Sequence, residues 1–446
     1  MQPEAHELKR SLGLVSAISI TVGAVIGSGI FMKALGVAQN LPDANWIYGT
    51  WIVLGLVCLF GAFAYAELGS LFPEAGGQYA FLRESWGRFP AFLYGWTFLL
   101  VINSGTLAAL AAGFALNLSS VVELSESQQI LIACGAIFVL ACVNHIGVES
   151  GALVQNVSTF AKLAALGAIV LGGAWLALQS GVKPAEVAKT VVQPEINMIV
   201  AACVAIFWAY EGWYQLPFNA AELKNPQRDL PRGLIWGMFI LIAVYVLVNA
   251  VYLQVVPIDE MRAMKNDIDV PKTAVARIFG GSGGWLAILV SISVLGSANP
   301  NLLSSPRAFY AMAKDGLAPR MFMQISARFR TPVLAIWGQA VWAMGLVIVM
   351  KKFKDLTDYV VFASLLFYAL TVAGVYVLRR RLPDAPRAHR CFGYPLTPFL
   401  FIAVTLAVDV FTLLDPQART NALIGIAIIA AGIPVYFVMD RRSTHG

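Results

Sequence analysis

Long apolar stretches separated by short polar segments run through almost the whole chain. A helix needs about 20 mostly apolar residues to cross the hydrocarbon core of a bilayer. The pattern predicts twelve segments of this kind, and hence an all-α membrane protein. They are Ser11–Met32, Ala44–Ala66, Phe89–Val122, Ser127–Val148, Ser150–Val182, Ile196–Ala221, Gly233–Ile258, Ile278–Pro306, Thr331–Met350, Tyr359–Leu378, Phe392–Leu414 and Thr420–Met439.

The composition agrees with this pattern and excludes other classes of protein. Hydrophobic residues make up 59% of the 446 residues and charged residues 13%, whereas a soluble domain carries about 25% charged residues. A disordered chain would be polar and poor in aromatic residues. The five cysteines and four histidines form no spacing that suggests a metal site or a catalytic cluster. We expect no metal, no cofactor and no enzyme, and a receptor would normally carry a larger aqueous domain.

The basic residues predict an orientation. Cytoplasmic loops of membrane proteins carry an excess of Lys and Arg. If the N-terminus is cytoplasmic, the two densest basic clusters, around Arg307–Arg330 and Arg379–Arg390, fall inside, and a smaller cluster at Lys351–Lys354 falls outside as an exception. We therefore expect both termini in the cytoplasm.

Two predicted spans contain helix breakers at a similar depth. Gly27-Ser28-Gly29 lies in the first span, and Glu211-Gly212 lies in the sixth. Paired interruptions five helices apart indicate an inverted repeat of the kind found in transporters. The prediction is a single transporter domain over 1–446, with repeats at about 12–182 and 196–381 and extra helices at about 392–440. Alternatively, the glycines only allow close helix packing.

An interrupted helix can bind charge with its backbone. The free N–H groups at the start of a half-helix favour an anion such as a carboxylate, and free carbonyls at a half-helix end favour a cation such as an ammonium. An α-amino acid carries both groups on adjacent atoms. Two interrupted helices side by side therefore suit a zwitterion.

Several motifs resemble those of a known family. The run Thr21 to Phe31 (TVGAVIGSGIF) resembles the first-helix signature of the amino acid–polyamine–organocation superfamily, and within it the L-type amino acid transporters and their bacterial relatives. The resemblance extends from about Leu12 to Tyr394. It includes PEAGGQY at 73–79, WAYEGW at 208–213, ELKNP at 222–226, SPRAFY at 305–310, Asp315-Gly316 and RCFGYP at 390–395.

The resemblance implies a LeuT-like fold of five plus five inverted helices, with helices 1 and 6 unwound at mid-membrane, and alternating access, usually as amino acid exchange. The substrate carboxylate would meet the first unwound segment and its ammonium the carbonyls of the sixth. Trp208 falls where the family places an aromatic gate over the bound substrate, and the alternative is an ordinary packing residue. The substrate-contacting positions implied are Ile26, Gly27, Ser28, Gly29, Ile30, Trp208, Ala209, Glu211 and Ser364.

Lys162 is a charge within the fifth apolar stretch. A charged group at membrane depth costs at least about 2.5–3.5 kcal/mol and indicates a functional site. Family members have a lysine here, in the neighbourhood where sodium-coupled relatives of the fold bind a sodium ion. Our hypothesis is that its ammonium replaces that ion, holding the chain near Gly23 and a hydroxyl of the eighth span, Ser291 or Ser293. Snorkelling to the interface and proton transfer are alternatives.

Glu211 departs from the small residue or Asp that several family members have. A carboxylate there could contact a substrate ammonium or admit a basic side chain. Alternatively, it pairs with a neighbouring helix and maintains the shape of the sixth span. The sequence supports both hypotheses equally.

We predict a sodium-independent exchanger of neutral L-amino acids, with a proton-coupled symporter of amino acids or polyamines as the alternative. Animal members of the family pair with a single-span glycoprotein through a cysteine between helices 3 and 4. The corresponding loop, Asn117–Gln128, has no cysteine, so no disulfide-linked heavy chain is expected. The short loops suggest the inner membrane of a prokaryote.

Overall fold

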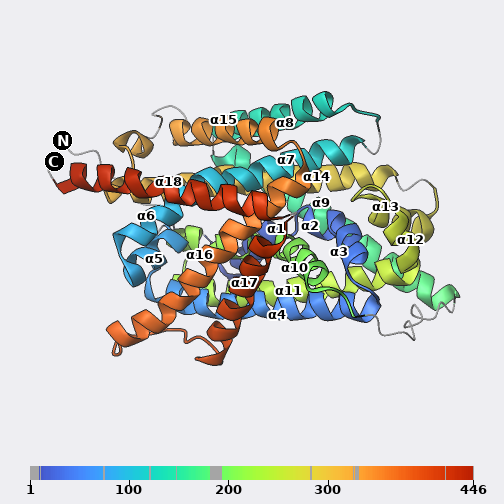
Figure 1. Ribbon diagram of the computed structural model, residues 1–446, viewed down its shortest axis with the longest axis horizontal. Coiled ribbons are helices and arrows are strands. Elements are labelled where there is room, and N and C mark those ends of the chain that lie inside the picture. The colour runs from blue at the N-terminus through green and yellow to red at the C-terminus, as the bar shows by residue number, and fades with distance from the viewer. Residues whose placement is uncertain are drawn as a thin grey trace.

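The structure is a computed structural model of the chain. It describes residues 10, 12–73, 76–119, 122–146, 148–180, 193–281, 284–324, 326, 331–416 and 418–444. Within these ranges the chain is helical, and its one isolated β-bridge joins Leu12 to Leu223. Most of the helices run along the long axis of the molecule (Figure 1).

The helices follow the predicted spans, with short helices between them. Their bounds are α1 Leu14–Val25, α2 Gly29–Met32, α3 Ala34–Asn40, α4 Ala44–Leu71, α5 Gln78–Trp86, α6 Arg88–Thr97, the π-helix η1 Phe98–Asn103, α7 Ser104–Ser119, α8 Glu126–Ile146, α9 Val148–Ser180, α10 Ile196–Tyr210, the 3₁₀ helix η2 Trp213–Glu222, α11 Pro226–Val255, α12 Ile258–Ala263, α13 Asp269–Phe279, α14 Gly284–Lys314, the 3₁₀ helix η3 Arg320–Met323, α15 Val333–Met350, α16 Phe353–Arg381, α17 Leu396–Leu414 and α18 Arg419–Thr444.

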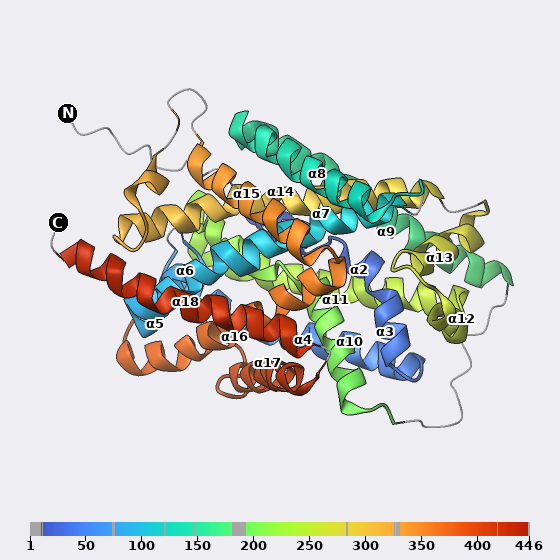
Figure 2. The same ribbon diagram turned by 45° about the horizontal axis from the view of Figure 1, so that its top comes forward.

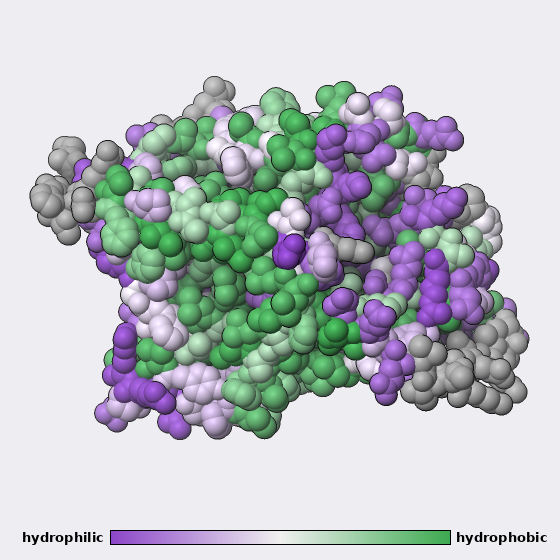
Figure 3. Space-filling model, in the orientation of Figure 1, coloured by the Kyte–Doolittle hydropathy of each residue, from purple (hydrophilic) through white to green (hydrophobic). Residues whose placement is uncertain are grey.

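Eleven segments of the described chain are long and apolar enough to cross a membrane. The predicted eighth span is the exception. It corresponds to α14, an α-helix of 31 residues. Figure 3 shows the hydrophobic residues gathered over the middle of the molecule and hydrophilic residues at the end that holds α12 and α13.

Two groups of helices make up the bundle. In the first, α11 packs along α1 and α4 and also contacts η2. In the second, α14 packs along α7, α8 and α15, and α9 packs against both α14 and α11. Figure 2 shows α10 beside α2 and α3, which it contacts. Ile26 and Ser28 at the interruption of the first span, and Tyr210 at that of the sixth, are buried in the interior.

Amide side chains bind the second group together. Each of three asparagines, all nearly without exposed surface, donates a hydrogen bond to α14. The pairs are Asn103 Nδ2 to Asn301 O at 2.7 Å, Asn117 Nδ2 to Ser291 Oγ at 2.7 Å and Asn144 Nδ2 to Asn299 Oδ1 at 2.8 Å. A buried amide left without its partner loses the full desolvation free energy of the group, so these contacts fix the rotation of α14.

A buried carboxylate connects three elements at one end of the bundle. Glu67 on α4 accepts hydrogen bonds from Arg379 Nε at 3.0 Å and Nη2 at 2.6 Å on α16. It also accepts from Arg387 Nε at 3.1 Å and from the backbone N–H of Cys391 at 2.7 Å, both in the segment before α17. Glu67 thus neutralises two arginines and orders the connection between α16 and α17.

We expect Glu67→Ala to lower the free energy of unfolding by about 3–5 kcal/mol, because removing one partner of a buried ion pair leaves the other charges unpaired. Thermal melting in detergent measures this change. Glu126→Ala is the matched control, because the Glu126 carboxylate pairs with Lys351 at 3.0 Å on the surface and exposed pairs contribute little. Equal losses in the two variants would contradict the central role of Glu67.

Candidate functional site

The first predicted span is interrupted in the interior of the bundle. α1 ends at Val25, Ile26 has the extended ψ of 92°, and the helix resumes at Gly29. The last carbonyls of α1 therefore have no helical partners. The N–H groups at the start of α2 are free in the same way, since intrahelical bonding begins with the N–H groups of Phe31 and Met32, which both donate to Ser28 O.

Lys162 supplies the missing partners for two of these carbonyls. Its Nζ lies 2.6 Å from Gly23 O, 2.6 Å from Ile26 O and 3.0 Å from Ser297 Oγ on α14. The residue has no exposed surface, so the ammonium points into the bundle and does not snorkel. An ammonium has three N–H donors, and all three are used.

The hydroxyl partner on α14 differs from the prediction. The bonded residue is Ser297, and neither Ser291 nor Ser293 touches the ammonium. Ser291 accepts from Asn117, and the Ser293 hydroxyl is buried without a hydrogen-bond partner. The ammonium reaches Ile26 as well as Gly23, and this position brings it level with a serine one helical turn further along α14.

The sixth predicted span is interrupted opposite the first. α10 ends at Tyr210, Glu211 is non-helical, and Gly212 has a φ of +108° before η2 begins. Only glycine adopts this region readily. A Cβ at Gly212 would also lie 2.8 Å from Ala24 O, so the two interruptions are in direct contact.

Tyr245 on α11 connects the two interruptions. Its hydroxyl lies 2.9 Å from Ala209 O and 3.2 Å from Val25 O, so a single donor serves the carbonyl end of both half-helices. The residue is fully buried. Sequence analysis missed Tyr245, because a tyrosine inside an apolar span carries no signal that distinguishes it from a packing residue.

The start of α2 and the end of α10 also meet closely. A Cβ at Gly29 would lie 2.3 Å from the Cα of Ala209, so only glycine allows this approach. Trp208 donates from Nε1 to Ser28 Oγ at 3.1 Å. The Trp208 ring meets that of Phe353 edge-on, with centroids 5.9 Å apart. The Trp208 side chain thus covers the first interruption.

The remaining predicted substrate contacts lie around these groups. Gly27 faces Ser297, whose Cβ would be 3.2 Å from a Cβ at position 27. Ile26 and Ile30 are buried. Ser364 on α16 is buried too, and its hydroxyl lies 3.5 Å from Glu211 Oε1. Glu211 accepts a shorter hydrogen bond from the Tyr368 hydroxyl at 2.7 Å, so its carboxylate is directed towards α16.

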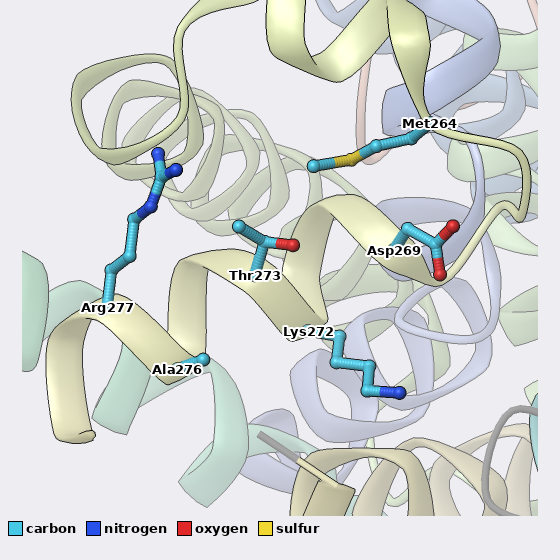
Figure 4. A pocket seen from close by; sticks show the side chains of 6 residues that line it. All are labelled: Met264, Asp269, Lys272, Thr273, Ala276 and Arg277. Atoms are coloured by element: carbon cyan, nitrogen blue, oxygen red, sulfur yellow. The ribbon is translucent and has the colours of Figure 1, made fainter. Parts of the chain in front are cut away.

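A separate groove lies on α13 at the hydrophilic end of the molecule, with a volume of about 490 Å³. Figure 4 shows the side chains of Arg277 and Lys272 pointing away from α13 in opposite directions. Arg277 is bonded to both carboxylate oxygens of Glu260 at 2.7 Å, and Asp269 accepts from Asn266. Since these charged groups already have partners, the groove is a poor candidate for the substrate site. Among the described residues, no group of three or more His, Cys, Asp or Glu side chains is arranged to hold a metal.

Two interrupted helices in contact with each other inside a helical bundle are typical of membrane transporters. The chain belongs to the amino acid permease family, whose sequence model matches residues 12–438.

Named relatives fall in the same family. The chain is 30% identical to the serine/threonine exchanger SteT of Bacillus subtilis, over 99% of both chains. It is 30% identical to the human b(0,+)-type amino acid transporter 1, over 98% of this chain and 89% of that one. It is 33% identical to the human large neutral amino acids transporter small subunit 2, over 97% of this chain and 80% of that one. These relatives are membrane transporters.

We expect Gly29→Ala to lower amino acid uptake by at least about tenfold, because its methyl group would overlap the backbone of Ala209 and such overpacking typically costs about 1–3 kcal/mol. Uptake into proteoliposomes measures this effect. Gly36→Ala on α3 is the control, since a Cβ there meets nothing within 4 Å. Normal uptake by Gly29→Ala would show that the close approach of the half-helices is not needed.

Proposed function

We propose that the protein is a sodium-independent exchanger of neutral L-amino acids that works by alternating access. The proposed fold is the LeuT-like arrangement of 12 transmembrane helices, with α14 as the eighth, repeats at about 12–182 and 196–381 and additional helices at about 392–440. The observation that carries this proposal is the contact between the two helix interruptions, together with their matched free backbone groups.

The substrate zwitterion would bind between the two interruptions. Its carboxylate would accept hydrogen bonds from the N–H groups of Gly27 to Ile30, since the start of a half-helix favours an anion. Its ammonium would meet the carbonyls of Trp208, Ala209 and Glu211. Ala209 O already accepts one hydrogen bond from Tyr245, and a carbonyl oxygen has a second lone pair for the substrate.

Lys162 would take the structural place of a coupling sodium ion. The three acceptors around its Nζ are two backbone carbonyls and one serine hydroxyl, and oxygen ligands of this kind would suit a hard cation. A fixed ammonium at this position supplies the positive charge without an ion gradient. Transport would then need no sodium.

Glu211 would hold the sixth span in shape. The hydrogen bond from Tyr368 and the neighbouring Ser364 occupy the side of the carboxylate that faces α16. A carboxylate engaged in this way is less available to a basic substrate side chain, and this supports neutral amino acids as the substrate class. Ser364 would influence the substrate side chain through Glu211.

The membrane setting follows from the same family. We propose a plasma membrane location in a prokaryote, with both termini cytoplasmic and without a disulfide-linked heavy chain. Support for the orientation comes from the arginine-rich end of α16, which lies at the end of the molecule opposite α12 and α13 (Figure 1).

Counterflow in proteoliposomes tests this function. We expect labelled leucine, serine or alanine to accumulate only when an unlabelled neutral amino acid is loaded inside, at the same rate in sodium and in choline buffer. Arginine in the panel tests whether Glu211 admits a basic side chain. Sodium-dependent uptake would contradict the proposal, and uptake that is driven by a proton gradient without internal substrate would establish the proton-coupled alternative.

We expect Lys162→Met to reduce exchange by at least about tenfold, because Gly23 O loses its partner, Ile26 O keeps only its hydrogen bond from Ser297 Oγ, and an unsatisfied buried group costs about 1–3 kcal/mol. The initial rate of counterflow measures the loss. Lys265→Met is the control, since Lys265 is an exposed lysine outside the spans. An unchanged rate in Lys162→Met would exclude a coupling role for this ammonium.

A further inference from the structure

A second buried lysine lies near the other end of the first interrupted span. Lys33 joins α2 to α3 and is only 6% exposed. Residues 29 to 40 continue from the first interruption towards the end of the molecule that holds α12 and α13 (Figure 2). The proposed function above gives Lys33 no role, although a buried ammonium is unfavourable unless it has strong partners.

The contacts of Lys33 are with α16. Its Nζ donates to Thr357 Oγ1 at 2.8 Å and lies 4.6 Å from the centre of the Phe353 ring. The Thr357 hydroxyl in turn donates to Lys354 O at 2.7 Å. Among the described residues, therefore, one hydrogen bond and one cation–π contact hold this ammonium.

Two acidic residues act on Lys33 from different elements, but neither accepts a hydrogen bond from its ammonium. Asp358 on α16 is paired with Lys354 at 2.7 Å. Asp267 lies in the segment between α12 and α13. Burial raises the pKa of the Asp267 carboxyl, and the positive charges of Lys33 and Lys354 partly offset this rise. Asp267 and Asp358 thus partly balance the charge of Lys33, but among the described residues neither carboxylate forms an ion pair with it.

The Phe353 ring connects Lys33 to the proposed substrate site. The Lys33 ammonium lies over the Phe353 ring, and the same ring meets the Trp208 ring edge-on. Trp208 then donates to Ser28 Oγ in the first interruption. A continuous set of contacts runs from Lys33 through Phe353 and Trp208 to Ser28.

We propose that Lys33, Phe353 and Thr357 form an outer latch, a set of positioning residues that closes the outer side of the substrate site over Trp208 and releases when the Lys33 ammonium returns to water. The proposal rests on the transport function proposed above.

The physical basis is the contrast between the two buried lysines. Lys162 has three acceptors within 3.0 Å, so its ammonium has little to gain from hydration. Lys33 has one hydroxyl acceptor, and water would supply three. Opening the latch loses a hydrogen bond and a cation–π contact but restores hydration, so the closed and open states are balanced closely enough for a transport cycle.

Two substitutions of the same hydrogen bond should act in opposite directions. Lys33→Met keeps all but the last atom of the side chain's length, so that it can still pack on Phe353, but removes the charge whose hydration favours opening. It should favour the closed latch. Thr357→Ala leaves the ammonium in place without its acceptor, and should favour the open latch. A purely structural role would shift both variants in the same direction.

The state of the latch can be measured at Met32. This residue has no exposed surface, and its side chain lies beside that of Phe353, since a Cβ at Gly113 would be within 3.4 Å of both. In a protein without its five native cysteines, Met32→Cys introduces a thiol that a membrane-impermeant maleimide reaches from outside only when the latch is open.

We expect the labelling rate at position 32 to fall by about fivefold or more in Lys33→Met and to rise by about fivefold or more in Thr357→Ala. The labelling rate follows the population of the open latch, and each variant shifts that two-state equilibrium. Thr405→Ala is the matched control, since the Thr405 hydroxyl on α17 bonds only within its own helix, to Phe401 O and Ile402 O. Its labelling rate should stay unchanged.

Melting temperatures establish that each variant is folded, and Thr357→Val replaces Thr357→Ala if the latter is not. Unchanged labelling in both folded variants, or changes in the same direction, would overturn the latch. Counterflow by the parent protein keeps the two proposals apart. If the parent exchanges amino acids while labelling does not respond, the latch is wrong and the proposed function stands. If labelling responds as expected but no amino acid is exchanged, the latch stands and the substrate class is wrong.

Discussion

Three backbone carbonyls at the interruption of the first span depend on three side chains from other helices. Gly23 O and Ile26 O accept from Lys162, Ile26 O accepts also from Ser297 Oγ, and Val25 O accepts from Tyr245. In a membrane interior each unsatisfied carbonyl would cost several kcal/mol, so α1 can end there only because these donors are present. Lys162 comes from α9 and Tyr245 from α11, and their hydrogen bonds therefore anchor the interruption to both groups of helices.

Polar contacts are distributed unevenly over the bundle, and this distribution separates rigid from movable parts. The asparagines bonded to α14 and the ammonium of Lys162, whose three donors are all used, make a scaffold. These groups would gain little by exchanging their hydrogen bonds for bonds to water. The contacts of α2 and α3 with α16, centred on Lys33, are sparse by comparison. Alternating access requires this kind of difference, because only contacts with closely balanced free energies can form and break in each cycle.

Glycine determines how closely the two interruptions approach. Gly29 brings the start of α2 against the backbone of Ala209, and Gly212 brings the start of η2 against Ala24 O. Any side chain at these positions would separate the half-helices, and one zwitterion could no longer reach both the free N–H groups and the carbonyls. The approach of the two backbones therefore defines the size of the proposed site.

The sequence alone determined the helical class, the apolar spans, the two interruptions and the unusual position of Lys162, because each is a local property of polarity or of a helix-breaking residue. Only the tertiary structure decided that Ser297 rather than Ser291 or Ser293 meets Lys162, that Tyr245 joins the interruptions and that Glu211 turns to Tyr368. These contacts depend on the rotation and register of helices that are distant in sequence. A shift of one turn, about 5.4 Å, exchanges one serine of α14 for the next, and the apolar pattern of a spanning helix is nearly the same after such a shift.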